Sequence, residues 1–342
     1  MTLKWENLLS PIRIRHLLAD DLSKRDPLDH RSHFDSDYDR AVFSTPLRRL
    51  QDKAQVFPLE PNDSVRTRLT HSLEVSTVSR DISRAVAKWL REDRKVVDVE
   101  QALDIETIAA TCGLIHDLGN PPFGHSGEEA IRDWFRVNQN KWKLFSDDEM
   151  RTFKNDFLLF EGNAQTLRLI SKLQMLTDFH GLNLTTATMS AACKYTASSN
   201  HLSKNIHERS KVGYFASEEK LIDLVRAQTG TGEARNPITY LVEAADDIVY
   251  SIIDIEDAIK KKVLSWERLK SILKKLQLSK IDELIKKSEG KVNECGIQME
   301  ESFREEAFIQ WFRVFVFREC VSAVIESLQG KLRINDAMRV SR

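Results

Sequence analysis

The stretch from residue 111 to residue 130, TCGLIHDLGNPPFGHSGEEA, most restricts how this chain can fold. Apolar residues at helical spacing precede this stretch and continue into its first residues; they are Ile105, Ile108, Ala109, Cys112 and Ile115. His116 and Asp117 then stand side by side, and Gly119 with the proline pair after it predicts that the helix ends there. Buried polar side chains must find partners. The stretch therefore predicts a helix that presents a histidine and an aspartate to a metal site.

The composition is typical of a mainly helical protein. Among 342 residues, Gly (12) and Pro (8) are scarce, helical patterns are long and alternating strand patterns are few, which predicts an all-α fold. Lys and Arg (51) nearly balance Asp and Glu (52), giving a net charge of -1. The overall charge therefore does not indicate a nucleic-acid-binding surface, and any anion-binding site must be local.

Cysteine spacing and hydropathy restrict the compartment. The cysteines are scattered without CxxC spacing, which favours a reducing compartment and excludes a cysteine zinc motif; they are Cys112, Cys193, Cys295 and Cys320. The N-terminus lacks a continuous apolar segment of the signal-peptide kind. No apolar run reaches the roughly 20 residues of a membrane span. We therefore expect a cytoplasmic protein that does not cross a membrane.

The chain is expected to divide into an N-terminal arm, irregular in structure, over residues 1–38, a core over 39–260 and a C-terminal helical region over 261–342, where Lys, Leu, Ile and Glu become frequent. Periodic apolar residues predict helices over 68–90, 129–135, 160–176, 236–260 and 300–328. A polar stretch predicts a surface excursion over 138–156, and within 177–217 the string SSNHLSKNIHERSKVGYF (198–215) predicts a long loop.

Candidate metal ligands occur in three predicted helical segments. His71 lies on the apolar face of residues 68–90, and the His116–Asp117 pair ends the next helix. Asp246 lies within the apolar helix 236–260, where an acid is costly unless it is paired or bound to a cation. Imidazole and carboxylate together suit Mn, Fe, Co, Ni or Zn, whereas an all-oxygen set would favour Mg or Ca. A single histidine in a protein core more often has a structural role than a metal-binding one. The hypothesis of a metal site therefore requires that these candidate ligands lie close together in the folded chain.

Other polar residues suggest proton transfer and anion binding. His125 and Glu128 follow the central loop and make a plausible acid/base pair, because a carboxylate that binds imidazole orients the ring and raises its basicity. The alternative is a surface histidine beside a glutamate that opens a helix. Lys194 lies just before the long predicted loop and Lys211 lies within it, and a lysine in such a loop is normally just solvated.

Five motifs in this order resemble the HD-domain deoxynucleoside triphosphate triphosphohydrolases, in particular the bacterial dGTP triphosphohydrolase branch. They are RLTHS (68–72), HDLGNPPFGHSGE (116–128), EGNAQ (161–165), KVGYFASE (211–218) and EAADDIVYS (243–251). The long second motif is specific to this family, whereas HD phosphohydrolases in general share only the His, His-Asp and Asp skeleton. The resemblance covers residues 39–260 and implies an HD-domain helical core.

The resemblance also implies roles for individual residues. The implied metal ligands are His71, His116, Asp117 and Asp246. The implied catalytic pair is His125 with Glu128. The implied substrate-binding residues are Gln55 (with Gln51 as the alternative match), Arg68, Asn120, Lys194, Lys211, Tyr250 and Asp254. Tyr250 and Asp254 would recognise the deoxyribose 3′-hydroxyl, with Gln55 near the same sugar, and Arg68 and the two lysines would bind the triphosphate.

The function implied by the resemblance is metal-dependent hydrolysis of dGTP or several dNTPs to the deoxynucleoside and inorganic tripolyphosphate, with Mn²⁺ or Mg²⁺ as cofactor. The resemblance also implies a homo-oligomer such as a hexamer, and a nucleotide or single-stranded DNA as effector. Two alternatives stay open: another HD-domain enzyme, either a 5′-nucleotidase or a phosphodiesterase, and a nucleotide- or ssDNA-binding regulator. Family members usually continue for further helices, so this chain is expected to be either shortened or a compact member.

Overall fold

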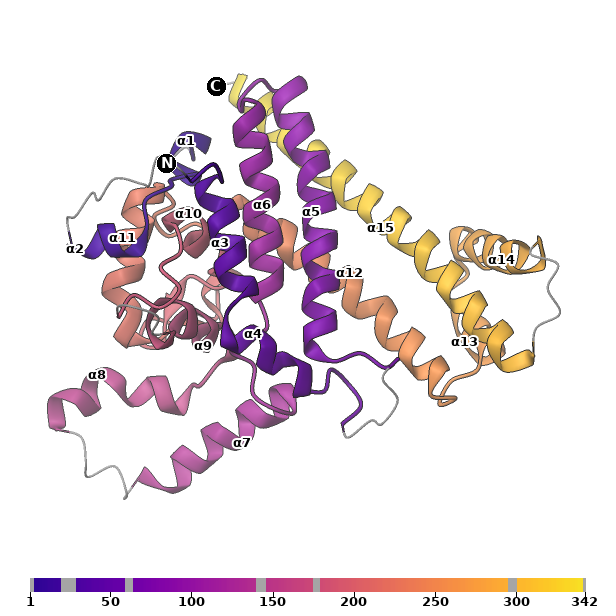
Figure 1. Ribbon diagram of the computed structural model, residues 1–342, viewed down its shortest axis with the longest axis horizontal. Coiled ribbons are helices and arrows are strands. Elements are labelled where there is room, and N and C mark those ends of the chain that lie inside the picture. Colours follow the sequence, from indigo (N-terminus) through magenta and orange to yellow (C-terminus); the bar gives the residue numbers. More distant parts are fainter. Residues whose placement is uncertain are drawn as a thin grey trace. The chain divides into compact units, whose positions relative to one another are not determined.

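The computed structural model describes residues 3–19, 29–58, 64–139, 146–174, 179–294 and 300–340. Helices dominate this part of the chain (Figure 1), so the prediction of an all-α fold is confirmed. The strands among these residues are β1 (Ala197–Ser198) and β2 (Val212–Tyr214), which pair in parallel. The chain divides into two compact units, of which unit 1 comprises Met1–Gln55 and Thr67–Glu243, and unit 2 comprises Val56–Arg66 and Ala244–Arg342.

Two long helices of unit 1, α5 (Arg68–Glu92) and α6 (Val99–Ile115), lie side by side (Figure 1). Each begins with a capping box, in which the N-cap side chain and the third residue of the helix satisfy each other's backbone N–H groups. The predicted helix over 68–90 is confirmed. The helix predicted to stop at Gly119 ends slightly earlier, at Ile115, with His116 as its C-cap and Asp117 in the turn that follows.

Small buried side chains let α5 and α6 approach closely. Ser76 Oγ donates to the main-chain oxygen of Ala110 at 2.8 Å. A Cβ added to Gly113 would lie 2.9 Å from Ser76 Cα and from Ser79 Oγ, a distance that real Cβ atoms do not reach. Close packing of this kind fixes the two helices rigidly and leaves little room for larger residues.

The prediction of an irregular N-terminal segment is wrong, because this part of unit 1 is helical. Within 1–38, the described residues contain α1 (Trp5–Leu8), α2 (Ile14–Ala19) and the first part of α3 (His33–Val42). Helix α4 (Thr45–Arg49) and the 3₁₀ turn Leu50–Asp52 follow this segment. Long-range pairing stabilises the N-terminal segment: Arg13 Nη1 lies 2.8 Å from Asp37 Oδ1, and Thr185 Oγ1 donates to Asp37 Oδ2 at 2.7 Å. Such partners are far apart in sequence, so helical periodicity did not reveal them.

Two of the predicted loops also contain regular structure. Within 138–156, helix α8 (Asp147–Leu158) begins at Ser146, whose capping box with Glu149 is a start signal that the sequence already carried; residues 140–145 lie outside the described residues. Within 177–217, the predicted loop over 198–215 contains the end of β1, the 3₁₀ turn His207–Arg209 and β2. Helix α10 (Thr186–Ala192) precedes this loop, and the 3₁₀ turn Ala216–Glu218 follows it. Residues 177–178 lie outside the described residues.

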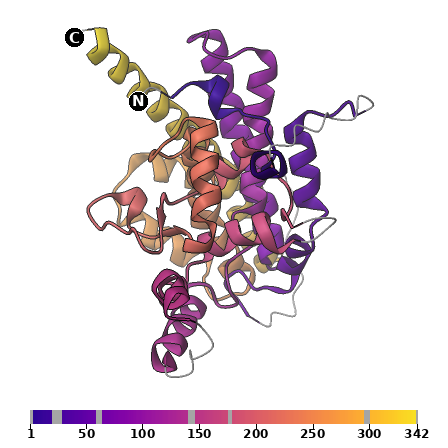
Figure 2. The same ribbon diagram turned by 90° about the vertical axis from the view of Figure 1, so that its left-hand side faces the viewer.

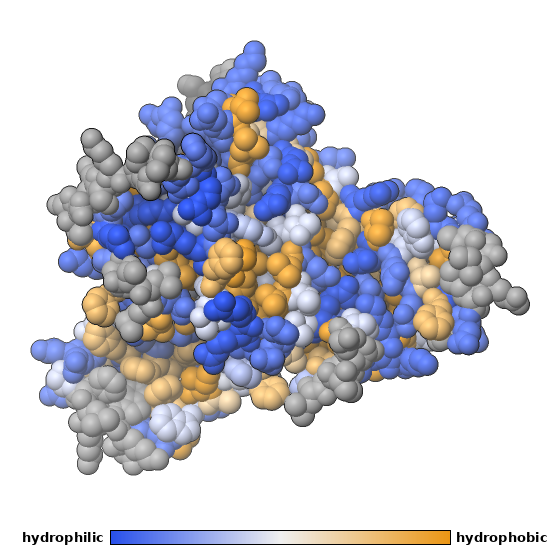
Figure 3. Space-filling model, viewed as in Figure 1, coloured by the Kyte–Doolittle hydropathy of each residue, from blue (hydrophilic) through white to orange (hydrophobic). Residues whose placement is uncertain are grey.

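Helix α7 (Gly124–Val137) and α8 form a hairpin in unit 1, side by side in both ribbon views (Figure 1, Figure 2). Apolar atoms gather on this hairpin at the lower left of Figure 3. An open cavity of about 440 Å³ lies along it, lined by Ile131, Phe135, Phe153, Asp156, Phe157, Phe160, Gln165, Arg168, Phe215 and Ser217. The only residue of α7 that is buried is Glu128, so the start of this helix is its firmest attachment.

The core of unit 1 lies beneath the C-terminal end of α6. Helix α9 (Gly162–Arg168), the π-helical turn Leu169–Leu173 and helix α11 (Glu219–Thr229) contribute to it. Its fully buried side chains include Ile14, Leu50, Leu114, Ile115, Leu167, Ile170, Leu182, Leu184 and Met189. Because Leu114 and Ile115 directly precede His116, the core holds the residue that opens the predicted site.

Helix α12 (Pro237–Lys260) confirms the helix predicted over 236–260; it belongs to unit 1 up to Glu243 and to unit 2 from Ala244. Unit 2 also contains α13 (Trp266–Lys274), α14 (Ser279–Glu294) and α15 (Glu301–Val340). Its core includes Ile259, Trp266, Leu269, Leu284, Ile285, Ile309 and Phe312. Among the described residues, no helix combines the length and the apolar character needed to cross a membrane.

The carboxyl group of Asp104, on α6, provides a test of how closely this helix is packed in unit 1. Its pKa is raised to about 6, chiefly by burial and additionally by the neighbouring carboxylates of Asp35, Glu100 and Asp98. A carboxylate whose pKa is higher in the folded state than in the unfolded state destabilises the protein increasingly as the pH rises from about 4 to about 6. We expect Asp104→Asn to stabilise the protein at about pH 7 by on the order of 1 kcal/mol, after allowance for solvent screening.

Melting temperatures measured between about pH 3 and about pH 7 check the prediction. The gain should shrink as the pH falls and vanish at about pH 3, where the wild-type carboxyl is mostly protonated in both the folded and the unfolded state. Asp81→Asn, at an exposed position of α5, is the control and should shift the melting temperature little at either pH. A gain that is the same at both ends of the range would contradict the burial of a charged Asp104.

Candidate active site

Two imidazoles and one carboxylate come together in the structure. His71 lies in the first turn of α5, and His116 ends α6; their ring centroids are 5.4 Å apart at an angle of 66°. Asp246 also lies on α12, three residues after Glu243, which is the last residue of this helix that belongs to unit 1. One ligand atom from each of the three residues lies within 4.8 Å of the other two. Among the described residues, this group is the one suited to hold a metal ion.

The hydrogen bond of His116 decides which of its ring nitrogens can bind a metal. Its Nδ1 lies 2.7 Å from the main-chain oxygen of Gly113, an acceptor, so Nδ1 carries the proton. The lone pair on Nε2 is then left for a ligand, and such a second hydrogen bond is typical of metal-binding histidines. Two imidazoles and a carboxylate fit a borderline divalent ion.

Asp117 and Asn120 form a second layer beside His116. The Asp117 carboxylate lies 3.2 Å from Arg68 Nη1, with both side chains buried, and it accepts a hydrogen bond from Asn120 Nδ2. Arg68 also donates from Nε to the main-chain oxygen of Ala54 at 3.2 Å. Asp117 is therefore held by an arginine and an amide, and it is not one of the three residues grouped within 4.8 Å.

The turn after His116 presses against the start of α9. Gly119 N donates to Thr166 Oγ1 at 2.9 Å, and Thr166 Oγ1 donates to the main-chain oxygen of His116 at 3.3 Å. A Cβ on Gly119 would lie 2.2 Å from both Gly162 O and Thr166 N, which are backbone atoms that cannot rotate away. Only glycine fits at residue 119, because the two segments meet through their backbones.

His125 and Glu128 form the predicted pair, with His125 Nδ1 3.0 Å from Glu128 Oε2. The prediction that they lie in a loop and that the helix begins at residue 129 is wrong, since both lie within α7, as its second and fifth residues. The reason is the left-handed conformation of Phe123 and Gly124, which reverses the chain after the proline pair and starts the helix early.

The two members of this pair differ in exposure. Glu128 is buried, accepts from Gly162 N at 2.7 Å and lies 3.5 Å from Arg132 Nη2, whereas the His125 side chain is 86% exposed. Arg132 also donates to the main-chain oxygen of Phe160 at 2.6 Å. A fixed carboxylate behind an accessible imidazole is the arrangement that general acid/base catalysis needs. Sequence reasoning missed Arg132, which carries no signal beyond its place four residues after Glu128.

Lys194 and Lys211 both lie near Tyr195 in unit 1, Lys194 as its neighbour in sequence. Lys211 Nζ is 5.8 Å from the centre of the Tyr195 ring, and Lys194 Nζ is 3.7 Å from Glu243 Oε1. The pairing of β1 with β2 brings the two segments together, and a Cβ on Gly213 would lie 1.8 Å from Tyr195 O. Close backbone contact, rather than a long flexible loop, therefore holds the two lysines.

The remaining predicted substrate residues lie in both units. Gln55 ends the first segment of unit 1, and within the described chain its buried Oε1 has no hydrogen-bond partner. Tyr250 and Asp254 lie one helical turn apart on the unit 2 part of α12, with Tyr250 exposed. Sequence reasoning gave no role to Lys53, whose Nζ donates to Asn120 O at 2.9 Å. Burial lowers the pKa of Lys53, and neighbouring Arg68 lowers it further.

Comparison with known proteins identifies the family of this chain. A family model described as HD domain matches residues 68–155. A deoxyguanosinetriphosphate triphosphohydrolase-like protein of Listeria innocua is 41% identical over 333 residues, which cover 95% of this chain and 70% of the relative. A protein of the same description from Pseudomonas aeruginosa (strain LESB58) is 38% identical, with 79% of this chain and 60% of the relative covered.

A deoxyguanosinetriphosphate triphosphohydrolase of Yersinia pestis (strain Pestoides F) is 39% identical over 273 residues, covering 69% of this chain and 52% of that protein. The helical fold and the His/Asp cluster thus define an HD-domain protein with a candidate divalent metal site. The chain belongs to the family of deoxyguanosinetriphosphate triphosphohydrolase-like proteins. The resemblance inferred from the motifs is confirmed at the level of the family.

Gly119→Ala tests the close contact between the turn after α6 and the start of α9. The added methyl group must displace backbone, so we expect a loss of about 2–4 kcal/mol in the free energy of unfolding, measured by urea denaturation. Gly290→Ala is the control, because no atom lies within 4 Å of its added Cβ in the interior of α14. It should leave stability unchanged or raise it by about 0.5–1 kcal/mol. Equal effects of the two substitutions would contradict the contact.

Proposed function

We propose that this protein hydrolyses deoxynucleoside triphosphates to the deoxynucleoside and inorganic tripolyphosphate. The observation that carries the proposal is a chain of contacts that links the candidate metal group to the acid/base pair. Glu128 accepts from Gly162 N, and the Cβ position of Gly162 faces Asn120 Oδ1. Asn120 in turn donates to Asp117, the neighbour of His116. The names of the relatives support a triphosphate substrate for this site.

The proposed metal ligands are His71, His116 and Asp246, with Asp117 as the fourth. A bound divalent ion, Mn²⁺ or Mg²⁺ in this proposal, would neutralise phosphate charge and lower the pKa of a bound water. Proteins also bind Fe, Co, Ni and Zn through imidazole and carboxylate groups, so these ligands are compatible with those ions as well. A triphosphate also needs cations from the protein, and we assign this role to Arg68, Lys194 and Lys211, with Asn120 lining the site.

His125 is the proposed proton-transfer group. Its Nδ1 is occupied by Glu128, so Nε2 is the atom that would exchange a proton with water or with the leaving 5′-oxygen. Glu128 is buried and bonded to Gly162 N, so it would hold the ring in one orientation while charge develops on it. The exposure of His125 supports this role, because a substrate must be able to reach the ring.

We assign recognition of the sugar to Gln55, Tyr250 and Asp254. The buried Oε1 of Gln55, without a hydrogen-bond partner within the described chain, is suited to accept from a hydroxyl group of a ligand. Tyr250 would exclude a 2′-hydroxyl by filling its space, which would make the enzyme selective for deoxynucleotides. We further propose a cytoplasmic homo-oligomer, such as a hexamer, that responds to a nucleotide or to single-stranded DNA.

Product analysis tests the reaction. Purified protein with Mn²⁺ is incubated with each dNTP and with GTP, and the products are separated by ion-exchange chromatography. We expect tripolyphosphate and deoxynucleoside in equal amounts from at least one dNTP, and much slower turnover of GTP. Orthophosphate as the product would favour another HD-domain phosphohydrolase, and stabilisation by dNTPs without turnover would favour a binding protein. Equal turnover of dGTP and GTP would contradict the role of Tyr250.

Two substitutions separate proton transfer from metal binding. His125→Ala should lower kcat by about 10²–10⁴-fold with the metal retained, because general acid/base catalysis contributes on this scale. Asp246→Asn should reduce the metal content, since it removes a charged ligand. Metal per chain is measured by plasma mass spectrometry on the same samples as the activity. Normal activity in both variants would refute the assignment of the site.

A further inference from the structure

Arg235 is a buried arginine to which the proposed reaction gives no role. Its side chain is 1% exposed and lies just before α12. Its Nε donates to the main-chain oxygen of Lys194 at 2.6 Å, its Nη2 lies 3.0 Å from Glu243 Oε2, and its guanidinium covers the Tyr240 ring at 4.7 Å. A buried cation is costly unless it is paired. These contacts compensate the charge of Arg235. They also connect its guanidinium to the main chain of Lys194, a proposed phosphate-binding residue.

Glu243 connects Arg235 to the side chain of the same lysine. Its Oε1 lies 3.7 Å from Lys194 Nζ, and its Oε2 lies 3.0 Å from Arg235. The closer ion pair fixes the carboxylate, so Lys194 is held by the looser of the two contacts. A phosphate group that enters the site can take over the lysine while Glu243 keeps its arginine partner. The carboxylate would then be compensated and would repel the phosphate less.

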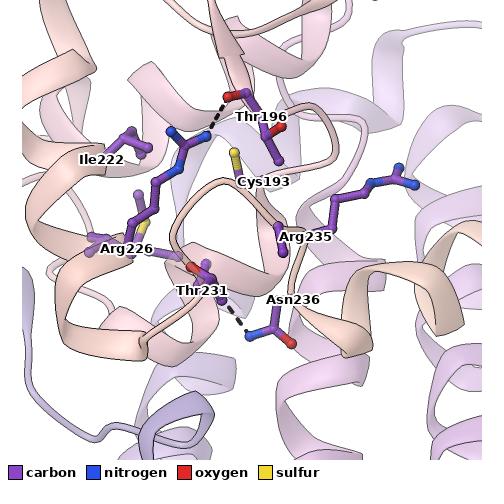
Figure 4. A pocket seen from close by; sticks show the side chains of 11 residues that line it. Cys193, Thr196, Ile222, Arg226, Thr231, Arg235 and Asn236 are labelled. Atoms are coloured by element: carbon purple, nitrogen blue, oxygen red, sulfur yellow. Dashed lines mark hydrogen bonds between the residues drawn. The ribbon is translucent and has the colours of Figure 1, made fainter. Parts of the chain in front are cut away.

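A second arginine, Arg226, binds the same segment two residues after Lys194. Arg226 donates to the main-chain oxygen of Thr196, and Thr196 N donates to Glu208 O at 2.7 Å. Figure 4 shows Arg226 reaching toward Thr196 beside Cys193, whereas Arg235 points away from the small cavity, of about 10 Å³, that residues of this region enclose. The backbone around Lys194 is thus fixed at two carbonyl oxygens by separate arginines.

We propose that Arg235 and Glu243 are positioning residues that set the backbone and the ammonium group of Lys194 for phosphate binding. The inference rests on the proposed function, because it takes the phosphate role of Lys194 from there. Arginine suits this task better than lysine, since its planar fork contacts a carbonyl oxygen and a carboxylate at once. The two residues act through Lys194, so their effect on phosphate binding must disappear when the lysine is removed.

A double-mutant cycle on the full chain tests this dependence. Binding of inorganic tripolyphosphate is measured by titration calorimetry, with the same concentration of Mn²⁺ in all samples. We expect Lys194→Ala to weaken binding about tenfold and Arg235→Lys about three- to tenfold, in line with lost charge-assisted contacts. The variant with both substitutions should bind as weakly as Lys194→Ala alone. Losses that multiply would show that Arg235 acts independently of Lys194, and would overturn the proposal.

A second variant and a matched control guard against unfolding. Glu243→Asp keeps the charge but shortens the side chain; it should weaken binding in the wild-type background and change nothing in the Lys194→Ala background. Arg13→Lys is the control, because Arg13 is largely buried and likewise contacts a carboxylate, that of Asp37, and a carbonyl oxygen, that of Asn183. It should lower the melting temperature and leave tripolyphosphate binding unchanged.

The outcomes separate this inference from the proposed reaction. Wild-type binding of tripolyphosphate without hydrolysis of any dNTP would count against the reaction alone, and the cycle would still decide the role of Arg235. Unchanged binding in Lys194→Ala would remove the phosphate role of that lysine and overturn the inference, even if dNTPs are hydrolysed. Weaker binding in Arg13→Lys, equal to that in Arg235→Lys, would attribute the effect to general loss of stability and would also overturn it.

Discussion

The close packing of α5 against α6 is the constraint on which the rest of the site depends. The backbone of Gly113 lies against Ser76 so tightly that a single added carbon would approach Ser76 Cα to 2.9 Å. This contact keeps the two helices in register, so His71 at the start of one and His116 at the end of the other meet with ring centroids 5.4 Å apart. Larger residues would separate the helices and would move apart the two imidazoles of the candidate metal group.

Gly162 is the second point of convergence, because three segments far apart in sequence meet there. Its N–H satisfies the buried Glu128 carboxylate, its carbonyl oxygen lies against Gly119, and its Cα faces Asn120. A buried carboxylate needs several donors, and Glu128 obtains them from this backbone and from Arg132. The packing of backbone on backbone thus couples the acid/base pair on α7 to the turn that follows His116.

The candidate site therefore combines two physical designs. The metal group and Glu128 are held in place by close packing and by hydrogen bonds to the backbone, whereas the groups that would meet the substrate, His125 and Lys211, are exposed. Fixed supports beneath accessible side chains reduce the reorganisation needed when charge develops in a transition state. The same division holds around Lys194, whose backbone is fixed by arginines and whose ammonium group is only loosely paired.

The sequence by itself determined the all-α class, the helices over 68–90 and 236–260, the helix end near His116 and the set of candidate residues, because helical periodicity, Gly and Pro signals and a long motif are local properties. It even carried the capping signal of α8 at Ser146, which the polar composition around it obscured. Only the tertiary structure decided that the N-terminal segment is helical, that Asp117 pairs with Arg68, that Arg132 lies beside Glu128, and that Arg235 donates to the main chain of Lys194. These features depend on long-range pairing, or on the partners that a buried charge finds, and no local pattern encodes them.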